Sequence, residues 1–100
     1  MGVIEQVKQE VSKVAPANEV VLFGSRARGT EHEESDWDFL ILLDQKEVTK
    51  EEKEQLIDLL YDLELNTGEV ISAIIHTKEE WEDRAVTPLY SIIEKEGIRA

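Results

Sequence analysis

The sequence predicts an α/β or α+β fold, in which helices pack against a small β-sheet. Helix-type and strand-type hydrophobic patterns alternate along the chain, as they do in layered folds that combine the two elements. Hydrophobic residues make up 41% of the 100 residues, which is enough for one core and not for two. The sequence contains no internal repeat and no linker. We therefore expect residues 1–100 to form a single domain, with the element order α-β-α-β-α-β-α.

The first half of the chain is expected to form a helix and two strands. Valines and an isoleucine at spacings of three and four predict a helix over residues 3–15, which ends before Pro16. A run of β-branched and aromatic residues predicts a strand over Val20–Phe23. Ser25 then stands where the N-cap of a short helical turn would be. After an exposed acidic loop, Asp36–Leu43 is nearly continuous in apolar residues and is expected to be a strand buried on both faces.

The second half is expected to form helices around one further strand. The expected elements are a helix that begins at Thr49 and ends near residue 65, a strand over 70–76, a short helix over 78–84 and a helical segment over 88–97. Thr49 and Thr77 are each followed three residues later by Glu, which is the pattern of a capping box. In the last helical segment, Leu89, Ile92 and Ile93 are expected to point inward.

The charge of the chain limits its partners. The net charge is −12, from 23 acidic and 11 basic side chains, so the surface repels nucleic-acid backbones and anionic lipid. We expect no direct nucleic-acid partner, whereas a basic protein or a small cationic molecule is compatible. The same charge would also serve solubility alone. No apolar run approaches the roughly 20 residues of a membrane span, and cysteine is absent, so we expect a cytoplasmic protein.

The dipeptide Gly24-Ser25 ends the first predicted strand. A glycine at this point lets the backbone turn sharply and lets a ligand approach it closely. The N–H groups that follow would point outward together and form a concavity for an anion. Ser25 adds a hydroxyl donor, and Arg26 and Arg28 add positive charge to an acidic protein. These are the components of a polyphosphate site, although Gly-Ser alone is more often an ordinary turn.

Asp36 and Asp38 open the second predicted strand. Alternate residues of a strand face the same side, so the two carboxylates project together and Trp37 points the other way into the core. Two carboxylates held together repel each other unless a cation lies between them. Mg²⁺ prefers oxygen ligands and is commonly bound by one or two carboxylates plus substrate phosphates. The pair therefore predicts a magnesium site, and a solvated pair at a strand end is the simpler alternative.

Taken together, the run from Gly24 to Asp38 resembles the nucleotidyltransferase signature of the DNA polymerase β-like superfamily. In that signature a Gly-Ser turn is followed by Asp-x-Asp or Asp-x-Glu. The segments GSRARG and SDWDF are similar to those of the minimal nucleotidyltransferases of bacteria and archaea, which are stand-alone domains of about this size. The resemblance covers most of the chain and implies the nucleotidyltransferase fold, with a small mixed sheet of three or more strands flanked by helices.

The resemblance implies transfer of a nucleotide from a nucleoside triphosphate, with ATP the expected donor, to an acceptor hydroxyl. Gly24 and Ser25 would hold the triphosphate, and Asp36 and Asp38 would be the catalytic carboxylates that ligate Mg²⁺. Either arginine, 26 or 28, would stabilise the leaving pyrophosphate, and the spacing does not decide between them.

The sequence departs from the family at a third carboxylate, which in the family serves as a metal ligand and base on a later strand. Ser72 stands at that position, and serine is a poor Mg²⁺ ligand and a weak base. Glu69 is three residues away and would face the other side of a regular strand. His76, at the end of the strand, is expected at the surface. An alternative is therefore a degenerate module that binds a nucleoside triphosphate or a partner without turnover.

The length of the chain leaves no room for a separate acceptor-binding domain, so the acceptor is expected to be small or carried by another protein. The resemblance implies one candidate, a helical HEPN-type toxin for which minimal nucleotidyltransferases act as antitoxins by transferring AMP. A weaker alternative is a small cationic acceptor such as an aminoglycoside.

Overall fold

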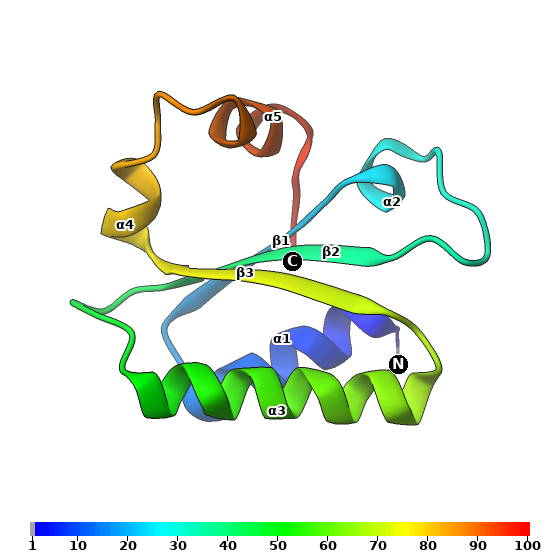
Figure 1. Ribbon diagram of the computed structural model, residues 1–100, viewed down its shortest axis with the longest axis horizontal. Helices are drawn as coiled ribbons and strands as arrows, with labels where there is room; N and C mark the ends of the chain where they lie inside the picture. The colour runs from blue at the N-terminus through cyan, green and yellow to red at the C-terminus, as the bar shows by residue number, and fades with distance from the viewer. Residues whose placement is uncertain (1) are drawn as a thin grey trace.

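The computed structural model describes residues 2–100 of the chain (Figure 1). The elements are α1 (Val3–Val14), β1 (Asn18–Phe23), α2 (Ser25–Arg28), β2 (Trp37–Leu43), α3 (Lys50–Thr67), β3 (Ile71–Thr77), α4 (Lys78–Glu82), α5 (Pro88–Glu96) and β4 (Ile98–Arg99). The mixture of helices and strands confirms the predicted fold class. The segments expected along the sequence, including the two helical segments at its end, match the elements up to α5, and β4 is an element that the prediction did not include.

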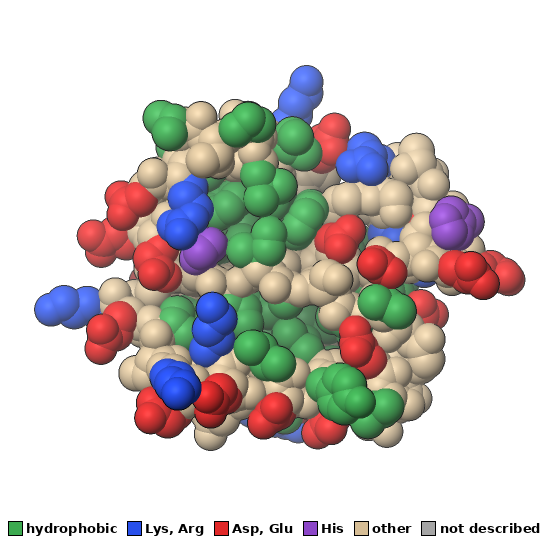
Figure 2. All heavy atoms as spheres, in the orientation of Figure 1, with side chains coloured by type: hydrophobic (Ala, Val, Ile, Leu, Met, Phe, Trp, Pro, Cys, Tyr) green, Lys and Arg blue, Asp and Glu red, His purple; other side chains and the backbone are tan. Residues whose placement is uncertain are grey.

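The strands form one mixed sheet in the order β3-β2-β1-β4. Strand β2 is central, and it pairs antiparallel with β1 and parallel with β3. The short strand β4 brings the C-terminal end of the chain back to β1. Strand β3 therefore forms one edge of the sheet, and Figure 2 shows this edge as a band of backbone between two hydrophobic areas.

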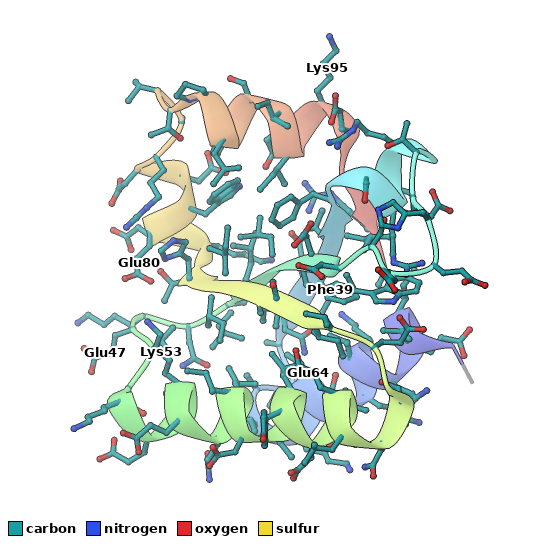
Figure 3. All side chains as sticks on the ribbon, turned by 45° about the vertical axis from the view of Figure 1, so that its right-hand side comes forward. Phe39, Glu47, Lys53, Glu64, Glu80 and Lys95 are labelled. Atoms are coloured by element: carbon teal, nitrogen blue, oxygen red, sulfur yellow. The ribbon has the colours of Figure 1, made fainter. Side chains whose placement is uncertain are left out.

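Helices cover both faces of the sheet. Helices α1 and α3 lie on one face, and α4 and α5 lie on the other (Figure 1). Their side chains fill the space on both sides of the strands (Figure 3). Helix α2 lies on the same side as α4 and α5, but at the opposite end of the sheet. The ends of β1 and β2 near α2 consequently remain less covered than the middle of the sheet.

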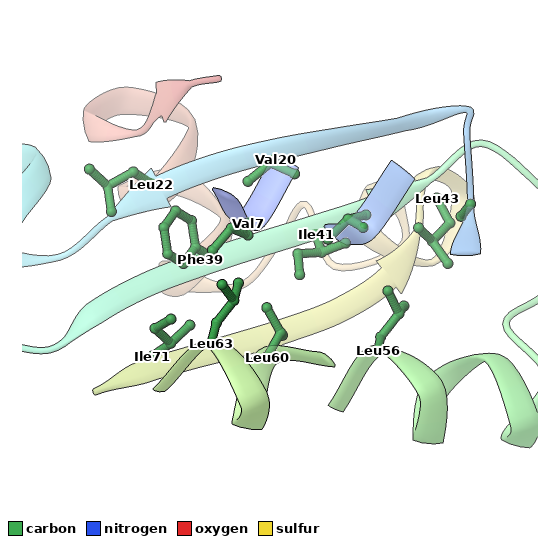
Figure 4. Close-up of a cluster of buried hydrophobic side chains, with 12 residues drawn as sticks. Val7, Val20, Leu22, Phe39, Ile41, Leu43, Leu56, Leu60, Leu63 and Ile71 are labelled. Atoms are coloured by element: carbon green, nitrogen blue, oxygen red, sulfur yellow. The ribbon is translucent and has the colours of Figure 1, made fainter. Parts of the chain in front are cut away.

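The larger hydrophobic core lies between the sheet and the helices α1 and α3 (Figure 4). Its buried members include Val7 and Val11 of α1, Phe39, Ile41 and Leu43 of β2, and Leu56, Leu60 and Leu63 of α3. On the other face, Leu40 and Leu42 pack with Trp81 and Ile93 of α4 and α5. All residues from 39 to 43 are buried, which confirms that β2 is buried on both faces.

Several expected boundaries and orientations are wrong. Strand β2 begins at Trp37, so Asp36 precedes the strand. The N-cap of α2 is Gly24 and not Ser25, which is the first helical residue, and no side chain caps this helix. Leu89 and Ile92 are 42% and 45% exposed, and only Ile93 of that expected inward group is buried.

Two of the helix starts are as expected. Thr49 and Thr77 both form capping boxes, in which the threonine hydroxyl accepts from a backbone N–H while Glu52 or Glu80 accepts from the threonine N–H. Of the helices within residues 2–100, none combines the length and the hydropathy that crossing a membrane requires.

Candidate active site

Gly24 and Asp38 are in direct contact at the end of the sheet. Phe23, the last residue of β1, is paired with Asp38 in the antiparallel register, so the turn after β1 begins beside this carboxylate. Gly24 has φ +79°, a conformation that L side chains rarely adopt. A Cβ atom at Gly24 would collide with Oδ2 of Asp38. Only glycine therefore allows the backbone of the turn to lie against the aspartate.

Asp36 lies close enough to Asp38 to change its ionisation. Burial raises the pKa of the Asp38 carboxyl group, the negative charge of Asp36 adds to this rise, and the positive charge of Arg28 opposes it. Asp38 is half-buried, whereas Asp36 is exposed. The structure thus places two carboxylates and one guanidinium group next to the Gly-Ser turn.

Helix α2 is a single short turn that starts at Ser25 and ends at Gly29, which has φ +76°. The N–H groups of Ala27 and Arg28 both donate to the carbonyl of Gly24 at 3.1 Å. The N–H groups of the first helical residues have no partner within their helix in general. Ser25 is the first of these helical residues, and it directly follows the glycine that touches Asp38.

The two arginines of this segment point to different places. The guanidinium of Arg26 donates to the carbonyl of Ser35 through Nε at 3.0 Å and Nη2 at 2.8 Å. It also lies over the ring of Trp37 at 4.2 Å from the centroid and 3.6 Å from Glu69. Arg26 therefore holds the acidic loop that precedes β2. Arg28 is the arginine that acts on Asp38, and its Nη1 lies 3.4 Å from Glu96.

Ser72 is the neighbour of Asp38 on the other side of β2. The parallel register pairs Asp38 with Ser72, so their side chains leave the sheet on the same face. Ser72 is exposed, because β3 is an edge strand. Glu69 lies on the opposite face, where it accepts a hydrogen bond from Nε1 of Trp37 at 3.2 Å. Within residues 2–100, no group of three or more His, Cys, Asp or Glu side chains is arranged to hold a metal ion.

The comparison with known proteins agrees with this geometry. A family model described as "Nucleotidyltransferase domain" matches residues 4–100. The chain belongs to the nucleotidyltransferase domain family. The resemblance drawn from the Gly-Ser turn and the Asp-x-Asp motif is thereby confirmed.

Two known proteins are similar to this chain. The protein named "Putative protein adenylyltransferase MJ0141" from Methanocaldococcus jannaschii is 37% identical over 78 residues, which cover 76% of this chain and 78% of the relative. A crystal structure of a toxin-antitoxin with AMP-PNP matches with a TM-score of 0.68 at 16% identity, covering 98% of this chain and 72% of that chain. At such low identity the second likeness shows the fold alone.

His76 does not belong to this part of the nucleotidyltransferase domain. It is paired with Leu42, four residues along the sheet from the pairing of Ser72 with Asp38, or about 13 Å away at the usual rise per residue. Its ring lies against Trp81 with centroids 6.4 Å apart. Burial lowers the pKa of His76 and Arg84 lowers it further, while Glu80 opposes the shift.

Two contacts of this nucleotidyltransferase domain had no signal in the sequence. Glu96, which contacts Arg28, is 68 residues away along the chain, and no local pattern connects the two. The loop bond from Arg26 to the Ser35 carbonyl involves the backbone, so the identity of residue 35 does not reveal it.

Proposed function

We propose that this chain transfers a nucleotide from a nucleoside triphosphate, with ATP as the preferred donor, to a hydroxyl group of a protein. The observation that carries the proposal is the contact between Gly24 and Asp38. It unites the Gly-Ser turn, which is suited to phosphate oxygens, with a carboxylate pair suited to a divalent cation. The name of the relative from Methanocaldococcus jannaschii supports a protein as acceptor and AMP as the transferred group.

The donor set fits Mg²⁺. Asp36 and Asp38 offer carboxylate oxygens, their mutual repulsion is relieved by a cation, and Gly24 leaves the space that a Cβ atom would fill. Mg²⁺ bound by these two residues would neutralise the triphosphate. The remaining requirement is a further set of oxygen ligands, which the substrate phosphates and water supply in sites of this kind.

The residues of the chain divide the reaction between them. The acceptor oxygen bonds to the α-phosphorus, the bond from that phosphorus to the bridging oxygen breaks, pyrophosphate leaves, and the hydroxyl hydrogen is released as a proton. Arg28 is placed to stabilise the negative charge that develops on the phosphates, because it already interacts with Asp38 at the site. Arg26 acts on the loop before β2 and so positions Asp36 rather than the triphosphate.

The experiment is a transfer assay with the two labelled forms of ATP. With Mg²⁺ and a protein extract as the source of acceptors, label from the α-phosphate should appear on protein and label from the γ-phosphate should not. Asp38→Asn should lower the transfer by at least about a hundredfold, as expected for loss of a group that acts in the transition state. Asp62→Asn, an exposed change on α3, removes the same charge and should transfer normally. Absence of α-label with each of the four nucleoside triphosphates contradicts the proposal.

Ser72 favours a second candidate, a module that binds nucleotide without turnover. Its hydroxyl occupies the place next to Asp38 where a third carboxylate would complete the site. This candidate predicts that Mg-ATP binds in titration calorimetry while no label is transferred. The wild type in the transfer assay separates the two candidates, and Ser72→Asp tests whether the missing carboxylate is the cause. If the site lacks only this carboxylate, the variant should begin to transfer label, whereas a measured turnover of the wild type excludes the second candidate.

The acceptor that we propose is a helical HEPN-type toxin, with this chain as its antitoxin. Two observations support this proposal. A toxin-antitoxin structure shares the fold, and the net charge of −12 on this chain is complementary to a basic RNA-cutting protein. Co-expression with a neighbouring helical protein of this kind tests it. The wild type should restore growth and Asp38→Asn should fail to do so. Equal growth with both would show that binding of the toxin, and not nucleotide transfer, neutralises it.

A further inference from the structure

Strand β3 is an edge strand that lacks most of the usual protection against pairing, although the side chain of Glu64 covers the N–H of Ile71 near its start. Natural edge strands are commonly shortened, bulged, or marked by lysine or proline, because unpaired backbone groups invite another strand. β3 has seven residues, contains neither lysine nor proline, and follows β2 in an uninterrupted register. The N–H of Ile71 points away from β2 and donates to Oε1 of Glu64 at 2.7 Å. Since alternate residues repeat this direction, Ala73 and Ile75 also present their backbone groups outward.

Hydrophobic surface borders this edge on both sides. A groove of about 510 Å³ lies between β3 and α3, and Ile57 and Tyr61 on its rim are 50% and 58% exposed. On the other side of the strand, Figure 2 shows a second hydrophobic area that borders α4 and α5. A chain that pairs with β3 would therefore have apolar surface to bury above and below its own strand.

The two ends of the edge differ in charge. Lys53 and Arg84 both act on His76, which places three nitrogen-containing side chains at the C-terminal end of β3. At the N-terminal end lie Glu64, through its bond to Ile71, and the carboxylate of Asp38 beside Ser72. In Figure 3, Lys53 and Glu64 extend from well-separated points of α3, both on the side that faces β3. Glu80, also at this end, accepts the Thr77 N–H in the capping box of α4, and its side chain is 51% exposed and keeps its negative charge.

We propose that two copies of this chain associate through β3. A two-fold rotation about an axis through Ala73 runs the two edge strands antiparallel and joins the two four-stranded sheets into one. The same rotation brings Lys53 of each copy to Glu64 of the other, and it packs Ile57 and Tyr61 of the two α3 helices together. Self-complementary charge is what selects a second copy as the occupant, although two chains of net charge −12 repel each other at long range.

The association has a consequence for the candidate active site. Because Ser72 belongs to β3 and is paired with Asp38, the carboxylate pair lies at the border of the interface. Arg84 of the second copy, on the side of the sheet that carries α4, then faces the acidic end that holds the site, whereas Lys53 lies on the α3 side opposite Glu64. Each copy would add positive charge near the other copy's triphosphate. This consequence rests on the proposed function, whereas the association itself does not.

Sedimentation velocity of the full chain tests the association. As its concentration approaches about 1 mM, the wild type should have twice the mass of one chain, and this dimer should dissociate on dilution. Ala73→Pro removes an outward N–H at the centre of the interface without removing a bond to β2, and proline is tolerated on edge strands, so this variant should be monomeric. Ala73→Ser keeps the N–H and should remain a dimer. Circular dichroism checks that each variant is folded.

Charge reversal gives an independent test that identifies the second copy as the occupant. Lys53→Glu and Glu64→Lys each place like charges across the two-fold axis, so each variant alone should be monomeric or at least tenfold weaker in association. An equimolar mixture of the two variants restores both opposite-charge contacts and should form a heterodimer. Repulsion or attraction of this kind is diagnostic, because it depends on the identity of both chains.

Three results would overturn the proposal. The first is a wild type that is monomeric at every concentration. This result overturns the proposal even if a different protein binds β3 and Ala73→Pro abolishes that binding. The second is a dimer that persists unchanged in Ala73→Pro and in both charge variants, since it must use another surface. The third is a mixture of the charge variants that fails to associate while the wild type does. If Ala73→Pro does not fold, the charge variants decide alone, with Lys53→Glu at an exposed position and Glu64→Lys checked for folding by circular dichroism.

Discussion

At the scale of single residues, Gly24 is required both for the backbone conformation of the turn and for the candidate site. Its positive φ and the nearby Asp38 carboxylate both exclude a side chain. We expect Gly24→Ala to lower the free energy of unfolding by about 2 kcal/mol, because the residue is forced into the left-handed region and its Cβ displaces Asp38. It should also abolish Mg-ATP binding, which titration calorimetry measures beside urea unfolding.

Gly29 provides the matched control for this substitution. It has φ +76°, close to the +79° of Gly24, but nothing lies within 4 Å of the place a Cβ atom would take. Gly29→Ala should therefore lower the free energy of unfolding by about 1 kcal/mol, the part that comes from backbone strain alone, while still binding Mg-ATP. If both alanine variants bind nucleotide equally well, the contact between residue 24 and Asp38 is not part of the binding site.

Asp38 should make stability depend on pH in an unusual direction. Its pKa is raised in the folded state, chiefly by burial, above the ordinary value of 3.8. The folded state therefore binds the proton more tightly than the unfolded state, so the contribution of this residue to stability falls as the pH rises through the window that starts near 3.8. Relative to wild type, Asp38→Asn should be more stable at pH 7 and should lose this advantage at about pH 3.

Thermal melts at the two pH values measure this difference. Asp62→Asn on the exposed face of α3 controls for the loss of one negative charge from a chain of net charge −12. An advantage of Asp38→Asn that is the same at both pH values, or that Asp62→Asn shares, would show that repulsion across the whole surface is the cause. Mg²⁺ must be absent, because its binding would stabilise the wild type and Asp62→Asn but not Asp38→Asn.

The sequence was informative about these residues to the extent that their relation is local. Period-two alternation is enough to associate Asp36 with Asp38, and a glycine after a strand is enough to predict a close approach. The different roles of Arg26 and Arg28 depend on Glu69 and Glu96, which are remote in the sequence. No spacing rule distinguishes the two arginines, so both had to be treated as candidates for the phosphate site.

At the scale of elements, the two capping boxes offer a matched pair for measurement. Thr49 starts α3 at an exposed position, whereas Thr77 starts α4 and is fully buried. Thr49→Ala should cost about 1 kcal/mol and Thr77→Ala about 2 kcal/mol, because burial leaves the freed N–H groups without water. Urea unfolding measures both, and an equal or smaller loss for Thr77→Ala would contradict the role assigned to burial.

Elements with a full period of hydrophobic residues were predictable, and the exceptions are short or set by distant contacts. Strand β4 has two residues, fewer than any alternation needs, and it forms because its partners in β1 are available. Leu89 and Ile92 follow the helical pattern, yet α5 contacts the core mainly through Ile93, because the other face has no element above it. Hydrophobic spacing identifies a stripe, but only packing shows how wide the buried part of the stripe is.

At the scale of the whole molecule, the excess of negative charge should act on stability apart from the site. Raising NaCl to about 0.5 M screens the repulsion among surface carboxylates and should raise the melting temperature of the wild type. About 5 mM Mg²⁺ at the same ionic strength should raise it further, because a ligand that binds only the folded state stabilises it. This second increment should vanish in Asp36→Asn and Asp38→Asn but not in Asp62→Asn.

The arrangement of the sheet also belongs to this scale, and the sequence indicated it only through family resemblance. Strand lengths and spacings do not tell which strand is central or whether a pair is parallel. The burial of β2 on both faces, through the apolar residues 39–43, was readable from the sequence. The exposure of β3 at an edge was not, because its alternation of residues is the same as that of an inner strand.

The two tryptophans give the protein an internal optical reporter. Trp81 is buried between the sheet and α5, whereas Trp37 is half-buried beneath the guanidinium of Arg26 and bonded to Glu69. Replacing Trp81 by phenylalanine would leave a single indole whose emission depends on the acidic loop. Any ligand that rearranges this loop should shift the emission maximum of that indole and change its quenching. Ligand binding beside the aspartates can therefore be followed in real time without an added dye.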